Sequence, residues 1–233
     1  MTDNGSQGQA VGADFERARR EMVTRQISER GIHSPRVLEA MQSVERHLFV
    51  PPEHAFRAYA DEPLPIGEGQ TISQPFMVAA MADALSLEGH ESVLEIGAGS
   101  GYQAAVISLL AREVIAIEAQ ITLAASARER LARLGFPNVR VEVGDGSLGW
   151  PANAPYDAIL VTAAAPAVPP PLIKQLAEGG RLVIPVGSAD HQDLFRIVKK
   201  SETTSQQSLF ACRFVPLLGR YGWREYNRES NRG

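Results

Sequence analysis

The stretch VLEIGAGSGYQAA, residues 93–105, limits the possible folds of this chain more than any other part of the sequence. An apolar run ends in an acid, glycines follow as Gly97, Gly99 and Gly101, and a helix-like segment begins at once. Glycine reaches backbone conformations with positive φ that other residues avoid, so alternate glycines permit a tight turn directly after a strand. In an open α/β sheet, the first turn from strand to helix is a common ligand site. The stretch therefore predicts a strand, a tight turn and a helix that together hold a ligand.

From residue 92 onward, apolar runs alternate with helix-like segments or short loops. The expected strands are 92–96, 113–118, 139–143, 156–161 and 181–186. This alternation predicts an α/β fold with a mostly parallel sheet and helices on both faces. Two further runs, 194–199 and 208–217, follow without a helix between them, so we expect them to form an antiparallel addition at one edge.

The sequence before this alternation is of a different kind. Residues 1–14 are small and polar, and we expect them to be disordered. Apolar residues then recur at helical intervals up to about residue 50, and Gly31 separates two expected helices. A third helix is expected over 76–87, with Pro75 in its first turn. The expected organisation is an N-terminal extension (1–14), a single domain (15–218) with a helical part (15–91) and an α/β core (92–218), and a polar tail (219–233).

The residue at the end of the glycine loop narrows the choice of ligand. The dinucleotide fingerprint G-x-G-x-x-G/A needs a small last residue, where the helix packs against the strand. Counted from Gly97, this position is Tyr102, and a bulky ring fits poorly there. An NAD-dependent oxidoreductase is therefore the weaker interpretation.

Two further strand ends carry acids that suit a nucleoside. Glu118 ends the second expected strand, and a carboxylate there can accept hydrogen bonds from both hydroxyls of a ribose. Asp145 and Gly146 follow the third expected strand, where an aspartate can accept a hydrogen bond from an adenine amino group. Together the loops predict a cleft for an adenosine-containing ligand that needs no pyrophosphate site. S-adenosylmethionine fits that description.

Each of these features also has a purely structural explanation. Glycines occur at any tight corner, Glu118 alone is typical of a solvated strand end, and Asp145 alone is typical of a turn. Thr71 and Ser73 stand just before the expected helix, where Ser73 fits the role of an N-cap. The functional interpretation is favoured because the three loops follow successive strands.

Composition excludes several other kinds of protein. The net charge of −4 gives no reason to expect a nucleic-acid partner, and no run approaches the roughly 20 apolar residues that span a bilayer. Cys212 is the only cysteine, so disulfides within the chain are excluded and a reducing compartment is expected. The histidines lack the spacing of metal ligands, and no G-x-S-x-G elbow is present. We expect a soluble, cytoplasmic monomer that binds no metal, nucleic acid or membrane.

Five sequence blocks resemble the protein-L-isoaspartate O-methyltransferase family. They are LPIGEGQTISQPFMVA, VLEIGAGSGYQAA, VGDGSLGW, APYDAILVTAAAPAVPPPLIKQLAEGGRLVIPVG and RFVPL, in the family's order over about residues 17–217. The glycine loop alone indicates only a class I methyltransferase, whereas the TISQP and VTAAAP to PVG blocks are more specific. The resemblance implies a Rossmann-like class I methyltransferase fold.

The resemblance also implies which residues form the site. Ser73 corresponds to the residue assigned to the active site, beside the transferred methyl group. Contacts to S-adenosylmethionine are implied for Thr71, Ile72, Ser73, Ser100, Glu118, Ala119, Asp145 and Gly146, and we add Gly97, Gly99 and Gly101 of the loop. We expect Ser73 and the backbone of Val186 and Gly187 to bind the substrate. The tail beyond Leu218 matches no recognised pattern, so no contact is predicted for it.

The implied reaction methylates the free α-carboxylate of L-isoaspartyl residues in damaged proteins and peptides. It yields S-adenosylhomocysteine and starts repair through a succinimide. An α-carboxyl group has a reference pKa of about 3.3–3.7, so the acceptor is ionised at neutral pH and needs no general base. Positioning in a dry cleft can supply about 7–11 kcal/mol of the barrier. Two alternatives stay open here, a class I methyltransferase for another small carboxylate and a non-catalytic nucleoside-binding module.

Overall fold

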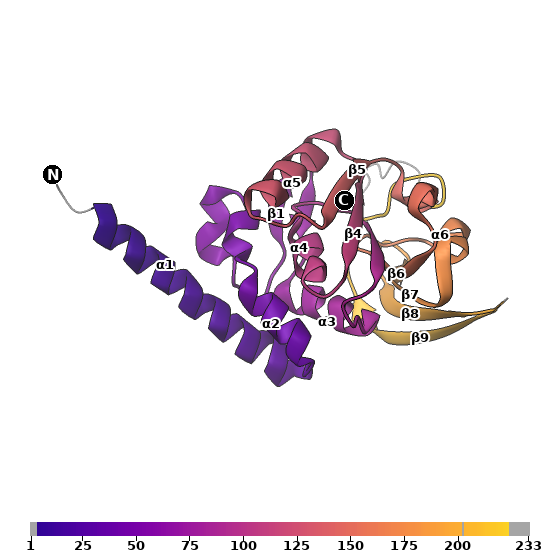
Figure 1. The fold of residues 1–233 in the computed structure, drawn as a ribbon, viewed down its shortest axis with the longest axis horizontal. Helices are drawn as coiled ribbons and strands as arrows, with labels where there is room; N and C mark the ends of the chain where they lie inside the picture. Colours follow the sequence, from indigo (N-terminus) through magenta and orange to yellow (C-terminus); the bar gives the residue numbers. More distant parts are fainter. Residues whose placement is uncertain (1–3, 202, 224–233) are drawn as a thin grey trace.

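The computed structural model describes residues 4–201 and 203–223 and shows a seven-stranded sheet with helices on both faces (Figure 1). The strand order is β5-β4-β3-β6-β7-β8-β9. The bounds are β3 Ser92–Ile96, β4 Glu113–Glu118, β5 Val139–Val143, β6 Tyr156–Val161, β7 Leu176–Gly187, β8 Gln192–Lys200 and β9 Thr203–Cys212. Neighbours from β5 to β7 are parallel, and β8 and β9 each run antiparallel to the strand before. The predicted α/β class, parallel sheet and antiparallel edge are confirmed.

Strand β7 begins earlier than the sequence predicts, at Leu176 rather than at Arg181. Its pairing with β6 shifts register between Tyr156 and Ala158, which face Leu176 and Arg181 respectively. Residues 177–180 form the irregular part of the strand, and the predicted run 181–186 is its regular part.

Strand β9 ends earlier than expected, because residues 213–217 leave the sheet edge. They bind Ala164 instead. The Ala164 N–H donates to the carbonyl of Val215 and the Ala164 carbonyl accepts from the N–H of Leu217, each at 2.8 Å. The segment is thereby drawn across the end of the sheet.

The helices pack into two apolar layers. The α-helices are α1 Asn4–Glu21, α2 Pro35–Ser43, α3 Pro75–Leu85, α4 Tyr102–Ser108, α5 Ile121–Arg133 and α6 Pro170–Gln175. Shorter helical segments are η1 Met22–Ile27, η2 Ser28–Arg30, η3 Arg46–Phe49, η4 Pro52–Arg57, η5 Gly146–Leu148 and η6 Pro151–Asn153. One core cluster includes Val78 of α3, Val106 of α4 and Ala127 of α5, and a second includes Leu172 of α6. Within the described residues, no helix is long and apolar enough to cross a bilayer.

A small hairpin, β1 Leu64–Gly67 and β2 Gln70–Ile72, precedes α3 and was not predicted. Its strands are short and contain glycine and proline, so their apolar pattern is too brief to indicate strands. The turn between them places Glu68 at a φ of 49°, in the left-handed region. The hairpin carries the TIS segment toward the ends of the core strands.

The N-terminal segment differs from the disorder expected for residues 1–14. Helix α1 begins at Asn4 and projects from the body of the molecule (Figure 1). Its inner end is held where the Phe15 ring stacks on His47, with ring centroids 4.1 Å apart. Once inner turns are formed, each further residue adds a backbone hydrogen bond without a new nucleation cost, so the helix extends outward. Residues 1–3 of the expected extension and 224–233 of the expected tail lie outside the described residues.

Candidate active site

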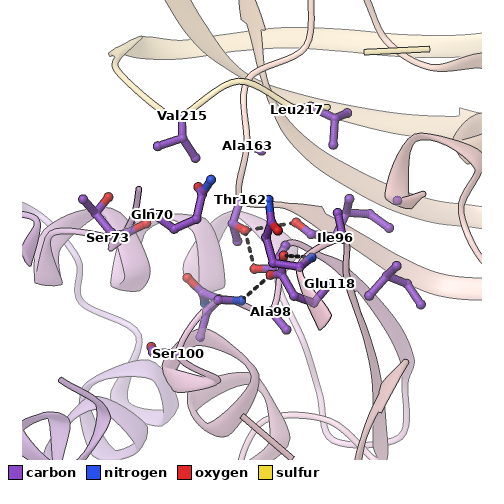
Figure 2. Close-up of a pocket in the computed structure, with 18 of the residues that line it drawn as sticks. Gln70, Ser73, Ile96, Ala98, Ser100, Glu118, Thr162, Ala163, Val215 and Leu217 are labelled. Atoms are coloured by element: carbon purple, nitrogen blue, oxygen red, sulfur yellow. Dashed lines mark hydrogen bonds between the residues drawn. The ribbon is translucent and has the colours of Figure 1, made fainter. Parts of the chain in front are cut away.

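A cavity lies at the carboxyl ends of β4, β3 and β6 (Figure 2). The chain runs from β3 outward to β4 and β5, then returns to place β6 on the other side of β3. Such a switch point opens a crevice between the loops that leave in opposite directions. The hairpin β1–β2 and residues 215–218 add the remaining walls. We call this space the cofactor cavity.

The glycine loop forms one wall of the cofactor cavity and is held to the neighbouring strands. Gly97, Gly99 and Gly101 have φ values of 97°, 52° and 85°, all in the left-handed region. The Gly97 N–H donates to the carbonyl of Ile117 in β4 at 2.8 Å. A Cβ at Gly97 would lie 2.5 Å from Oγ1 of Thr162, so a side chain there would displace the loop. The predicted tight turn is confirmed.

Glu118 ends β4 and turns its carboxylate toward the glycine loop (Figure 2). Its Oε2 accepts from the Gly99 N–H at 2.8 Å, and its Oε1 accepts from the Gln120 N–H at 3.0 Å. The residue is buried and lines the cavity. An ionised carboxylate can accept about four hydrogen bonds, so acceptor capacity is left for ligand hydroxyls. Its contact with a ribose stays a prediction.

Glu95, in β3, is a second acid behind the loop and was not assigned a role from the sequence. It is fully buried, and neither carboxyl oxygen has a hydrogen-bond partner within the described chain. Burial raises the pKa of this carboxyl well above its ordinary value, and the negative charge of Glu118 raises it further. Glu95 does not line the cofactor cavity, so Glu118 is the acid of these two that faces a ligand.

Asp145 follows β5 and ties the C-terminal tail to the core. Its Oδ1 accepts from the N–H and the hydroxyl of Ser147, at 2.9 and 2.6 Å, and its Oδ2 accepts from the Arg220 N–H at 2.8 Å. The neighbouring Gly146 lines the cofactor cavity, whereas the Asp145 side chain does not. Asp145 therefore anchors the tail, and its contact with adenine stays a prediction.

Ser73 lies at the cavity wall directly after β2, which contains Thr71 and Ile72 (Figure 2). The N-cap explanation for Ser73 is wrong: the N-cap residue of α3 is Gln74, and no side chain caps this end. Pro75 occupies the first turn, where a missing N–H costs nothing. The Ser73 hydroxyl has no hydrogen-bond partner in the part of the chain that the structure describes, so it is available to a ligand.

Most other predicted residues line the cavity, and a few do not. Ile72, Ser100 and Ala119 are in its wall. Gly101 is not: a Cβ there would lie 3.1 Å from the Leu131 side chain, so this glycine lets α5 approach the loop.

Val186 and Gly187 end β7 and do not line the cofactor cavity. The Gly187 N–H donates to the carbonyl of Ala165 at 3.1 Å, so the backbone donor expected to bind the substrate is already used. The predicted substrate contact of these two residues therefore has no support in the structure.

Several lining residues were not predicted. They are Gln70, Val78, Ile96, Ala98, Tyr102, Gln103, Ile117, Gln120, Thr162, Ala163, Val215, Pro216, Leu217 and Leu218. Thr162 had a signal of the same kind as Glu118, a polar residue directly after an apolar strand, and its hydroxyl donates to the carbonyl of Gly97 at 2.7 Å. Residues 215–217 belong to the RFVPL block, but nothing in the sequence places residues 215–218 at the site, because their position depends on the distant Ala164.

The charges of the cavity wall select among ligands. Among the described residues that line the cavity, Glu118 is the one carboxylate, and there is no lysine, arginine or histidine. The pyrophosphate of a dinucleotide would bring further negative charge close to this carboxylate, whereas a sulfonium would bring a positive charge. The wall therefore suits an adenosyl sulfonium better than a dinucleotide. Among the residues described, no group of His, Cys, Asp and Glu side chains is arranged to hold a metal ion.

Comparison with protein families gives a match over most of the chain. Residues 17–222 match the family described as protein-L-isoaspartate(D-aspartate) O-methyltransferase. A protein-L-isoaspartate O-methyltransferase of Trichlorobacter lovleyi is 56% identical over 211 residues, which are 90% of this chain and 97% of the relative. One of Syntrophobacter fumaroxidans is 53% identical over 210 residues, 90% of this chain and 98% of the relative.

Solved structures agree with the sequence matches. A protein-L-isoaspartate O-methyltransferase structure superposes with a TM-score of 0.79 at 30% identity, covering 88% of this chain and 67% of the other. A Plasmodium falciparum structure named for the same activity, in complex with S-adenosyl-L-homocysteine, has a TM-score of 0.73 at 26% identity. It covers 86% of this chain and 98% of the other.

Proposed function

The chain belongs to the protein-L-isoaspartate O-methyltransferase family, and we propose that it carries out the family's reaction where the cofactor cavity meets Ser73. The enzyme transfers a methyl group from S-adenosylmethionine to the α-carboxylate of L-isoaspartyl residues in proteins and peptides. The observation that carries the location is the cavity at the switch point, where Glu118 is the one charged side chain among the described lining residues.

Three loops would hold the donor. Glu118 accepts the ribose hydroxyls through the acceptor capacity left beside its two backbone hydrogen bonds. Gly99 keeps its side of the cavity open, and Ser100 adds a polar group to the wall. Gly146 packs against the Ile96 side chain, where a Cβ would overlap it, and so brings its backbone to the cavity wall. Asp145, next to it in the chain, would accept a hydrogen bond from the adenine amino group.

The donor brings its own activation, because its transferable methyl group is bound to a positively charged sulfur. The acceptor is ionised at neutral pH, so no side chain has to remove a proton. What remains for the chain is orientation, and Ser73 is placed to donate a hydrogen bond to one carboxylate oxygen. With that oxygen held, the other can face the methyl group. The backbone nitrogen of the next residue then attacks the ester carbonyl, and the succinimide forms with loss of methanol, without help from the enzyme.

A paired-peptide assay tests this function. An isoaspartyl peptide and its twin with a normal aspartyl residue are incubated with labelled S-adenosylmethionine, and methyl ester formation is measured. We expect labelling of the isoaspartyl peptide alone, and none with a Gly99→Val variant. Equal labelling of the twin, or of free small carboxylic acids, would contradict the assignment.

The cellular setting is also a proposal. Cys212 is half-buried, and burial raises the pKa of its thiol to about 11, with the charge of Asp193 adding to the shift. A thiol of this kind suits a reducing compartment such as the cytoplasm. We expect a monomer that acts on isoaspartyl-containing proteins without nucleic acid, and gel filtration tests the oligomeric state.

A further inference from the structure

A second cavity adjoins the cofactor cavity, and we call it the groove. It has a volume of about 770 Å³ and shares Thr71, Ser73, Thr162 and Val215 with the cofactor cavity. A substrate carboxylate at Ser73 therefore has the donor on one side and the groove on the other. An isoaspartyl residue within a protein has peptide chain on both sides. The groove offers space for part of that chain.

The groove has an apolar body. Phe76 and Met77 of α3 line it together with Phe210 of β9, and the rings of Phe76 and Phe210 lie 6.0 Å apart. Such surfaces bind the aliphatic and backbone parts of an extended peptide without selecting a charge. Selection by charge must come from the polar residues of the groove.

The described residues that line the groove include two arginines and no carboxylate. Arg30 lies over the Phe76 ring, 3.8 Å from its centroid, and pairs with Asp61 at 2.6 Å, so its charge is largely compensated. Arg213 is exposed, and no ion pair or hydrogen bond of its side chain is found within the described residues. Asp193 is close enough to raise the pKa of Cys212 but does not line the groove. The uncompensated charge in the groove is therefore that of Arg213.

We propose that the groove holds the peptide beside the isoaspartyl residue and that Arg213 makes this enzyme prefer substrates with acidic side chains in that flank. The inference rests on the proposed function and adds a specificity-determining residue to it. The attraction acts between partly solvated charges, so it favours binding by a modest factor and weakens as salt is added.

The test uses isoaspartyl peptides that differ only in the residues next to the isoaspartate. Glu, Gln or Lys is placed one or two positions before it in one set and after it in another, and kcat and KM are measured at low and high ionic strength. With the unchanged enzyme, we expect Glu to exceed Gln by about two- to five-fold in kcat/KM in at least one set. The difference should lie in KM and shrink at high salt.

Variants separate Arg213 from the rest of the surface. Arg213→Gln should remove the preference, and Arg213→Glu should reverse it. Arg133→Gln, which removes an exposed charge on α5 outside both cavities, should keep the preference. A preference for Lys, equal values for all peptides, or a preference that survives Arg213→Glu would overturn the inference. Failure of the proposed function is distinct, because then no isoaspartyl peptide in either set would be methylated.

Discussion

The carboxylate of Glu118 and the backbone N–H of Gly99 are joined by a 2.8 Å hydrogen bond between the end of one strand and the turn after its neighbour. The group proposed to hold the ribose therefore also fixes the loop that shapes the cavity. Removing this carboxylate takes away ligand contacts and a support of the loop at the same time.

Replacing Glu118 by alanine should therefore weaken binding of S-adenosylmethionine. Hydrogen bonds to charged groups contribute about 1.5–3 kcal/mol, so we expect Kd to rise about 10- to 100-fold by calorimetry. Glu142→Ala on β5, outside the cavity, is the matched control and should bind normally. An unchanged Kd for Glu118→Ala would refute the ribose contact.

Replacing Ser73 by alanine should lower kcat and leave stability unchanged. A lost hydrogen bond to the acceptor carboxylate predicts a fall of about 10- to 100-fold in kcat. Because Ser73 caps no helix, the melting temperature should stay the same. Ser34 is the contrasting control, since its hydroxyl accepts from the Val37 N–H as the cap of α2. Ser34→Ala should cost about 1 kcal/mol of stability at full kcat, and the reverse pattern would restore the cap explanation for Ser73.

Replacing Gly99 by valine should abolish cofactor binding. Gly99 has a φ of 52° and lines the cavity, and even a Cβ would approach Ile66 to 3.3 Å. The measurement is the rise in melting temperature with S-adenosylhomocysteine, which should disappear. Gly135→Val suffers similar left-handed strain, with a φ of 80°, but its Cβ meets no atom within 4 Å, so its thermal shift should persist. A shift retained by Gly99→Val would count against the loop as the binding site.

Replacing Gly219 by alanine should weaken cofactor binding from outside the cavity. Its Cβ would overlap the Asp145 carboxylate, so the tail and Asp145 would have to separate. We expect a higher Kd for S-adenosylmethionine and faster proteolysis of the tail. Gly135→Ala, where a Cβ meets nothing, is the control. Normal affinity with a detached tail would show that cofactor binding does not depend on the contact between the tail and Asp145.

Replacing Glu95 by glutamine should stabilise the protein more as the pH rises. The folded-state pKa of Glu95 is raised by burial and by Glu118, so the proton favours folding below the unfolded-state pKa, about 4.3. This contribution is lost as the pH rises toward the folded-state pKa, because unfolding then releases the proton. Urea unfolding at pH 5 and pH 8 should show the difference between variant and parent growing with pH. Glu129→Gln, exposed on α5, is the control, and a constant difference for Glu95→Gln would mean that Glu95 is ionised in the folded protein.

The parts of the fold that follow from local pattern could be predicted. The strands 92–96 and 113–118 have the expected bounds because each is an apolar run closed by a glycine or an acid. The loop glycines and Glu118 were found for the same reason. Their roles depend on a turn and a strand end, which are local features.

The parts that depend on distant contacts could not be predicted. Residues 215–218 enter the site because Ala164 binds their backbone, a contact that no neighbouring residue signals. Two further features are of the same kind. Asp145 binds the backbone of Arg220, and Arg213 and Phe76 line the same groove. Whether Ser73 caps helix α3 also could not be decided from the sequence. The structure shows that the N-cap residue of α3 is Gln74.

The residues shared by the cofactor cavity and the groove limit how the substrate preference of this enzyme can evolve. Thr71, Ser73, Thr162 and Val215 line both the cofactor cavity and the groove. A substitution at one of these residues that makes room for a bulkier peptide would also change the wall of the cofactor cavity. Adaptation to new substrates is therefore easier at residues that line only the groove, such as Arg213, than at the four shared residues.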